Sequence, residues 1–378
     1  MTTRTLGAPS EWEQIETLLP ADWRQLADQH GLFRRKLPPH LGAKVHDISV
    51  ILRLVLFHVA ANVALIGATA AFAAAGVVTL SSVALHKWMR RLGPYLADLV
   101  ARMAGASALF APQRWAGYVV MLADASTVSR PGATGTTARL HTALRLADLR
   151  VVQVYVTDEK GGETLRRFDV AACELWITDR GYANPPGVAM VADAKAAVLT
   201  RYNRGALPLY GATGRALNVL AMLRKLRKPL ATREWAVWVC PAGHEAIRGR
   251  LCAVRLPLEK AEEARRRARK EQGPTVSAET LAMADFVVVF TTASSDRLST
   301  AQVLELYRLR WQIELQYKRD KSITGLDRLP NFRKDTIESW LYAKLLLHQL
   351  LRRIAAPDGA FPPGAFARCC LPSKLHAA

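Results

Sequence analysis

Acidic residues are scarce in this chain, and their scarcity narrows the choice of partner. Asp and Glu number 32 against 52 Lys and Arg, which makes a formal net charge of +20 and a pI near 10.2. This imbalance favours a polyanionic partner, most simply nucleic acid. Ribosome association or solubility alone would also fit the charge, so it sets a direction and does not identify the partner.

Regularly spaced cysteines are also lacking. The five cysteines are Cys173, Cys240, Cys252, Cys369 and Cys370. Their odd number and irregular spacing do not fit a disulfide framework. Cys240, His244 and Cys252 are a candidate metal set, but no CxxC pair accompanies them, and isolated thiols in a reducing compartment fit better. The N-terminus has no apolar signal-peptide core, and we find no internal repeat.

One long stretch, Ile48–Leu80, has few charges and raises the possibility of a membrane span. Polar residues, among them Arg53 and His58, interrupt its first half, and glycines break its second half. We therefore expect two buried helices of an N-terminal helical bundle. The expected protein is soluble and cytoplasmic, without a membrane partner.

The first 110 residues have a helical pattern that includes a candidate DNA-binding motif. A short helix and a glycine-containing turn precede Val83–Leu92, which carries four basic side chains and can be capped by Ser81 or Ser82. This order resembles a helix-turn-helix with a basic recognition helix. The alternative is a surface helix of the bundle with a basic outer face.

Residues 118–203 have a mixed pattern of strands and short helices. The apolar run Tyr118–Ala123 ends on Asp124, and the run Leu175–Thr178 ends on Asp179. The predicted order is three strands, a short helix at 163–168, a strand, a helix and a strand. Because ligands of open α/β sheets gather at the carboxyl ends of strands, both aspartates are expected at one edge.

The stretch Tyr307–Lys321 presents charged groups on one side of a predicted helix, which Ser299 would cap. Tyr307, Arg310, Glu314 and Lys321 fall within an arc of about 60° at about 100° per residue. An apolar stripe beside this arc would dock the helix on a core. A carboxylate among cations suits a site that holds a metal ion and a phosphate together, although many amphipathic helices simply have a solvated charged face.

Asp124, Asp179 and Glu314 together indicate a two-metal phosphoryl-transfer site, because such ions need bridging carboxylates. Alone, either aspartate would be more simply a cap or turn residue. Here the sequence resembles the DDE transposases of the bacterial insertion-sequence 4 family. The resemblance lies in Asp124 with its following Ser-Thr, in the Asp179-Arg180-Gly181-Tyr182 motif, and in the Tyr-x2-Arg-x3-Glu-x6-Lys spacing from Tyr307 to Lys321.

The resemblance implies an α/β fold with a ribonuclease H-like mixed sheet core, a helical N-terminal DNA-binding region and a largely β insertion domain. The implied boundaries are 1–112 for the helical region, 113–204 and 291–356 for the two parts of the core, 205–290 for the insertion and 357–378 for a loose tail. In related transposases an aromatic residue of the insertion stacks on a flipped base during hairpin formation. Trp235 and Trp238 are candidates here, but core packing explains them at least as well.

The resemblance also implies roles for individual residues. Asp124, Asp179 and Glu314 would be catalytic and would hold Mg²⁺, for which Mn²⁺ is expected to substitute. Phosphates would be bound by the cations and tyrosines of the motifs: Tyr307, Arg310, Lys321, Arg180, Tyr182 and Arg201. The expected partners are double-stranded DNA, at transposon ends and target, and a second copy in a homodimeric synaptic complex. The enzyme would be cytoplasmic and nucleoid-associated.

Three functions follow from these patterns. The first is a DNA transposase that binds inverted-repeat ends, cleaves the DNA and joins 3′ ends to target DNA. The second is a catalytically silent DNA-binding protein derived from a transposase, which the intact carboxylates disfavour. The third is a ribonuclease H-like nuclease without strand transfer, which the arginine and lysine of the helix motif disfavour.

Overall fold

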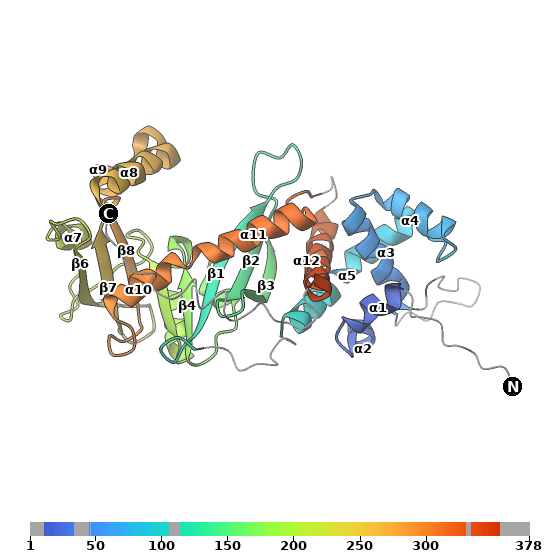
Figure 1. Ribbon diagram of the computed structural model, residues 1–378, viewed down its shortest axis with the longest axis horizontal. Helices are drawn as coiled ribbons and strands as arrows, with labels where there is room; N and C mark the ends of the chain where they lie inside the picture. Colours follow the sequence, from blue (N-terminus) through green and yellow to red (C-terminus); the bar gives the residue numbers. More distant parts are fainter. Residues whose placement is uncertain (1–10, 34–44, 46, 106–113, 330–333, 356–378) are drawn as a thin grey trace.

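A mixed sheet runs through the centre of the elongated molecule (Figure 1). The computed structural model describes residues 11–33, 45, 47–105, 114–329 and 334–355. The strands are β1 (Val119–Val128), β2 (Ala138–Arg145), β3 (Arg150–Asp158), β4 (Glu174–Thr178), β5 (Ala197–Arg201), β6 (Thr232–Val239), β7 (Ile247–Arg255) and β8 (Phe286–Thr291). Their order across the sheet is β3-β2-β1-β4-β5-β8-β7-β6. β4 pairs in parallel with β1 and β5, and the other pairs are antiparallel.

The predicted α/β class and ribonuclease H-like mixed sheet are confirmed. The predicted order of elements over residues 118–203 is also confirmed, with one correction. Residues 163–168 do not form an α-helix but only the 3-10 turn η2 (Leu165–Arg167). The following helix α6 (Pro185–Asp193) begins with two prolines, and the Asn184 side chain accepts from Gly187 N–H at its start.

Helices cover both faces of the sheet because successive side chains of each strand point to opposite sides. On one face, Val120 and Leu122 of β1 join a core built with the long helices α5 (Ser82–Gly105), α10 (Thr300–Arg308), α11 (Trp311–Thr324) and α12 (Ile337–Ala355). On the other face, Met121 and Ala123 join a second core with α6 and α7 (Val219–Leu223). Two further helices, α8 (Leu258–Gln272) and α9 (Ala278–Met283), project beyond the sheet (Figure 1). The remaining 3-10 turns are η3 (Arg180–Tyr182), η4 (Gly273–Thr275) and η5 (Lys334–Thr336).

The N-terminal helices form the bundle that the sequence predicts. They are α1 (Glu11–Thr17), α2 (Trp23–Gln29), α3 (Ile48–Ala61) and α4 (Leu65–Ala74), followed by α5. The apolar stretch 48–80 thus becomes the buried α3 and the shorter α4, although α4 leaves Ile66 exposed. No helix within the described ranges is both long enough and apolar enough to cross a membrane.

The candidate recognition helix is longer and more deeply packed than predicted. It extends through Pro94 to Gly105 as α5, because residues such as Leu96 and Leu99 bury against the core of the bundle. Its Arg90 pairs with Asp335 at 2.7 Å, and Arg91 donates to the carbonyl of Leu32 at 2.8 Å. These contacts favour the alternative of a bundle helix with a basic outer face.

The helix predicted from Ser299 through Lys321 is two helices. Ser299 begins α10 with the predicted cap, completed by Gln302 as a capping box. The chain then tightens between α10 and α11, where Arg310 N–H donates to Tyr307 C=O at 3.1 Å and Ile313 N–H donates to Arg310 C=O at 3.2 Å. Each of these bonds joins a residue to the third residue before it instead of the fourth, so the prediction of one regular α-helix was wrong at its centre.

The strands of residues 205–290 extend the central sheet. β8 pairs with β5, and β7 and β6 continue from it. On β6, Trp235 shares a face with the buried Val237 and Val239 and packs against their core, as the packing alternative predicted for it. Trp238 lies on the opposite face of the strand. The loose tail predicted for 357–378 lies outside the described residues.

Candidate active site

Two aspartates lie level with each other on neighbouring parallel strands. The last parallel pair of β1 and β4 is Ala123 with Thr178, so Asp124 and Asp179 are the next residue on each strand. The prediction that Asp124 ends its strand was wrong. Antiparallel pairing with β2 extends β1 beyond Asp124 to Val128. Asp179 does leave the sheet, and its side chain accepts from Arg180 N–H at the start of η3.

The Asp124 carboxyl is mostly buried, with 16% of its side chain exposed. Burial, with smaller contributions from the charges of Asp179 and Glu163, raises its pKa to about 7. A hydrogen bond from Ala125 N–H and the charge of Arg310 act in the opposite direction but do not outweigh burial. The Tyr317 hydroxyl donates to the Asp124 carbonyl at 2.7 Å and so fixes α11 to this point of β1.

Arg310 connects the aspartate to the acidic residue of α11. Its Nη2 lies 2.6 Å from Glu314 Oε1, and its Nη1 lies 3.7 Å from Asp124 Oδ2. Burial lowers the pKa of the guanidinium, but Tyr307 and the surrounding carboxylates outweigh burial and raise it. The cation between Asp124 and Glu314 therefore stays charged and offsets their repulsion.

Tyr307 lies in the last turn of α10, three residues before Arg310, and the charges of Arg310 and Asp179 act on its hydroxyl. Burial, together with the charge of Asp179, raises the pKa of its hydroxyl to about 12. The hydroxyl therefore stays protonated at neutral pH and can donate a hydrogen bond. The charge of Arg201, at the exposed end of β5, also acts on Tyr307.

Glu163 is a fourth carboxylate of this region, and sequence reasoning missed it. Its pKa is raised by burial and by Asp179, and opposed by Arg139. The side chain lies directly over Gly181, where a Cβ atom would overlap the Glu163 carboxylate. This close approach explains the glycine of the Asp-Arg-Gly-Tyr motif. No local pattern marks Glu163, because only the fold brings it to Gly181.

The other predicted residues lie further out. Arg180 reaches Glu271 of α8 at 3.4 Å, and the buried Tyr182 hydroxyl lies 3.3 Å from His141 Nδ1. Lys321 follows Glu314 by about 10 Å along α11, at 1.5 Å per residue. In the described part of the chain its ammonium forms no ion pair. The structure thus brings together Asp124, Asp179, Tyr307, Arg310 and Glu314 and leaves Lys321 at the rim.

This region suits a metal ion in the type of ligand atoms that it offers, which are carboxylate oxygens. Within the described residues, no three His, Cys, Asp or Glu side chains are close enough together to hold a metal. This applies to Asp124, Asp179 and Glu314 as well as to Cys240, His244 and Cys252. The Arg310 guanidinium occupies the place of a cation between Asp124 and Glu314. Carboxylate oxygens are the donors that Mg²⁺ prefers, and a bound cation would favour the charged form of Asp124 that burial disfavours.

Comparisons with known proteins agree with this arrangement. A family model described as Transposase DDE domain matches residues 115–350. The chain is 31% identical over 329 residues to the transposase for insertion sequence element IS421 of Escherichia coli, covering 85% of this chain and 88% of that protein. It is 32% identical over 328 residues to InsL for insertion sequence element IS186A of Escherichia coli (strain K12), with the same coverage. A shorter match, 36% over 77 residues, covers 20% of this chain and 16% of the transposase for insertion sequence element IS231F of Bacillus thuringiensis subsp. israelensis.

Proposed function

The chain belongs to the DDE transposase family, and we propose that it binds the inverted-repeat ends of an insertion sequence, cleaves the DNA and joins its 3′ ends to target DNA. The observation that carries the proposal is the meeting of Asp124 and Asp179 with Glu314 through Arg310. The three acids lie on separate elements, β1, the start of η3 and α11, and Arg310 at the start of α11 contacts two of them. Duplex DNA is the partner, and a homodimer would hold the two transposon ends together.

Asp124, Asp179 and Glu314 would hold divalent ions, Mg²⁺ or in its place Mn²⁺. When bound, these ions activate the attacking oxygen and stabilise the leaving oxygen of the phosphodiester. The chain's own cations and donors bind and orient the DNA. Arg310 and Lys321 offer charge to backbone phosphates, and the protonated Tyr307 hydroxyl offers a neutral donor. Arg180, Tyr182 and Arg201 support this surface from η3 and β5.

A strand-transfer assay tests the proposal against its two alternatives. The protein, a plasmid carrying the DNA that flanks this gene, and a target plasmid are incubated with Mg²⁺. A transposase yields joined products with element ends covalently linked to target DNA. Cleavage without joining would support the nuclease alternative, and DNA binding without cleavage would support the alternative of a catalytically silent DNA-binding protein.

Arg310→Ala is expected to weaken DNA binding and to make it less salt-dependent. Each phosphate contact contributes about 0.9 to the slope of log affinity against log salt, so the slope should fall by about that amount. Fluorescence anisotropy over a potassium chloride series measures it. Arg308→Ala is the control, because Arg308 is an exposed arginine of α10 beside the junction. Equal slopes for the parent and Arg310→Ala would remove Arg310 from the phosphate-binding residues.

Glu163→Ala is expected to reduce metal-dependent cleavage by about 10- to 100-fold, the usual effect of losing a group that supports metal ligands. Gly181→Ala should act in the same direction, because the new methyl group forces the Glu163 carboxylate aside. The double variant should be no worse than Glu163→Ala alone, since alanine at 163 leaves nothing to displace. Cleavage rates and Mn²⁺ titrations followed by electron paramagnetic resonance measure both effects. Independent, additive losses would show that Gly181 does not act through Glu163.

A further inference from the structure

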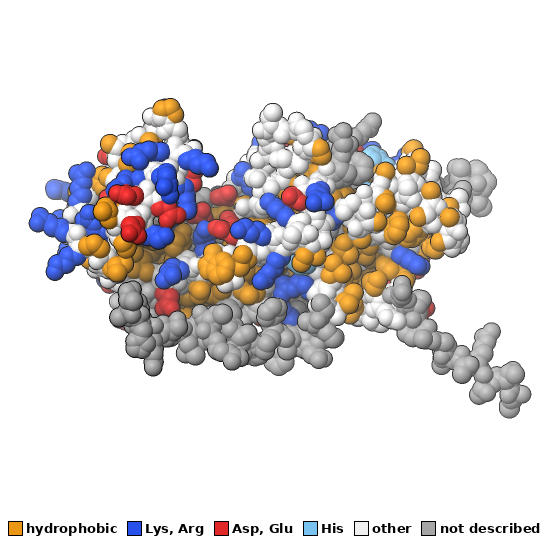
Figure 2. Space-filling model, turned by 45° about the horizontal axis from the view of Figure 1, so that its top comes forward, with side chains coloured by type: hydrophobic (Ala, Val, Ile, Leu, Met, Phe, Trp, Pro, Cys, Tyr) orange, Lys and Arg blue, Asp and Glu red, His pale blue; other side chains and the backbone are white. Residues whose placement is uncertain are grey.

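A strongly basic segment lies away from the carboxylates. Residues 194–233 contain nine Lys and Arg and no Asp or Glu. Five of these cations form what we call the basic end, next to α7 and β6: Arg224, Lys225, Arg227, Lys228 and Arg233. All five are exposed, and none forms an ion pair with any described residue. Lys and Arg side chains gather at this end of the molecule, beside the mixed charges of α8 (Figure 2).

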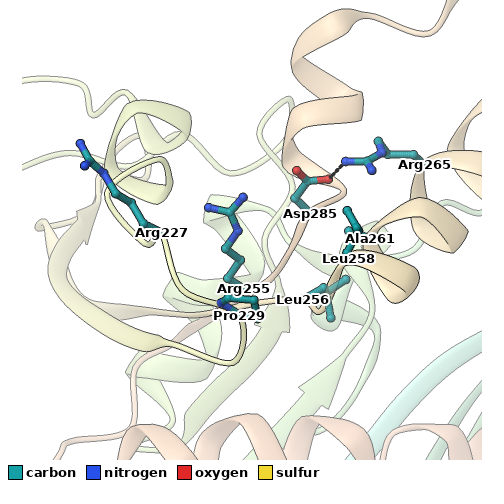
Figure 3. Close-up of a pocket in the computed structure, with 8 residues that line it drawn as sticks. All are labelled: Arg227, Pro229, Arg255, Leu256, Leu258, Ala261, Arg265 and Asp285. Carbon is teal, nitrogen blue, oxygen red and sulfur yellow. Dashed lines mark hydrogen bonds and ion pairs between the residues drawn. The ribbon is translucent and has the colours of Figure 1, made fainter.

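A pocket of about 190 Å³ opens beside the basic end. Three arginines and one acid line it, Arg227, Arg255, Arg265 and Asp285, together with apolar atoms of neighbouring residues (Figure 3). Arg265 is paired with Asp285 at 2.5 Å, so the charge of that arginine is offset. Arg227 and Arg255 have no acidic partner among the described residues, which leaves the pocket with a net positive charge.

Two contacts fix the guanidinium of Arg255 at the pocket. Its Nη1 donates to the Leu226 carbonyl at 2.9 Å, and its guanidinium lies 5.7 Å from the centre of the Phe286 ring. These contacts fix the planar group and leave other N–H donors directed at the pocket space between Arg227 and Asp285 (Figure 3). A fixed guanidinium loses little entropy when it binds a phosphate with two hydrogen bonds.

The helix α8 connects the pocket to the candidate active site. Ala261 lines the pocket, and Glu271 pairs with Arg180, the residue after Asp179. Glu271 follows Ala261 by ten positions, which span about 15 Å at 1.5 Å per residue. Along a duplex with 3.4 Å between nucleotides, this corresponds to roughly four to five nucleotides. One DNA duplex can therefore reach both places.

We propose that this pocket is a second DNA-binding site, which takes a backbone phosphate of the duplex whose scissile bond lies at the carboxylates. The inference rests on the proposed function and names a surface that the DDE residues do not include. Duplex DNA fits better than an acidic protein because a long unpaired run of cations flanks the pocket, and DNA presents phosphates at regular intervals. Neighbouring phosphates would contact the exposed side chains of the basic end.

The test compares two variants of the full chain with the parent. Arg227→Gln/Lys228→Gln removes two exposed charges whose side chains form no hydrogen bond or ion pair with the described residues, so folding should be unchanged. The second variant adds Arg255→Gln. Lys195→Gln is the matched control, because Lys195 is an exposed cation of the same acid-free segment but lies before β5, at the edge opposite Asp179. Circular dichroism verifies that every variant is folded.

Binding of a 40-base-pair duplex is measured over a potassium chloride series. The slope of log affinity against log salt should fall by about two in the double variant and by about three in the triple variant, at about 0.9 per phosphate. Lys195→Gln should match the parent. With saturating DNA, the cleavage rate of the triple variant should equal that of the parent, because the carboxylates are untouched.

Parental slopes and affinities in the triple variant would overturn the pocket proposal, while parental cleavage in the same experiment would leave the proposed function standing. Failure of the parent itself to bind or cleave DNA would instead contradict the proposed function. If the triple variant lost cleavage even at saturating DNA, the pocket residues would act on the chemistry, and the proposal of a separate phosphate site would be wrong.

Discussion

Glu314→Gln should abolish DNA cleavage while leaving DNA binding intact. The side chain is 48% exposed and contacts Arg310, so glutamine fits its place without disturbing the fold. Glutamine keeps the shape but lacks the anionic oxygen that a hard cation requires. Metal ions contribute several kcal/mol to such reactions, so cleavage should fall by at least about 1,000-fold.

The control for Glu314→Gln is Glu305→Gln, an exposed glutamate on the neighbouring helix α10. Cleavage is measured on plasmid DNA with Mg²⁺, and binding by fluorescence anisotropy at the same salt concentration. The control should behave like the parent in both assays. Loss of binding in parallel with cleavage would show that Glu314 maintains the DNA surface and would contradict a purely catalytic role.

Asp124→Asn should raise the melting temperature of the metal-free protein at pH 8 while removing cleavage. The pKa of Asp124 rises from 3.8 to about 7 on folding, mainly because burial disfavours its charged form. The folded state therefore binds this proton more tightly than the unfolded state. Stability from this group falls as pH rises from about 4 to about 7, and the loss is complete above that range. The full shift corresponds to roughly 4 kcal/mol, an upper limit for the gain from asparagine.

Differential scanning fluorimetry from pH 4 to pH 8 measures this effect. The advantage of Asp124→Asn should be present at pH 8 and absent at pH 4, where the parental carboxyl is already neutral. Mg²⁺ should narrow the difference at pH 8 by stabilising only the protein that binds it. If the melting temperature of Asp124→Asn at pH 8 equalled or fell below that of the parent, burial of the charged Asp124 carboxylate would not destabilise the folded protein, and the prediction would be wrong.

Sequence reasoning predicted the meeting of Asp124 and Asp179 because both follow apolar runs that read as neighbouring strands. It did not predict that β1 continues to Val128, since that extension depends on pairing with β2. The break between α10 and α11 was also hidden, because Leu309 and Arg310 keep right-handed helical backbone angles and no proline or glycine marks the turn.

Glu163 and α5 show the limits of local pattern in two other ways. Glu163 follows a charged turn, and its position near the acids arises only when β4 and η3 bring Gly181 beneath it. In α5, tertiary packing overrides the end predicted at Leu92, because α12 packs against the residues beyond it. Contacts distant in sequence decide both outcomes.

The most direct test of the central claim is Mg²⁺-dependent cleavage of a supercoiled plasmid that carries the DNA flanking this gene, with Asp179→Ala assayed beside the parent. We predict cuts at two defined ends for the parent, no cuts without the metal, and no cuts for Asp179→Ala despite equal DNA binding. Equal cutting by the parent and Asp179→Ala, or a folded and DNA-bound parent that fails to cut in either Mg²⁺ or Mn²⁺, would contradict the assignment of these carboxylates as the active site.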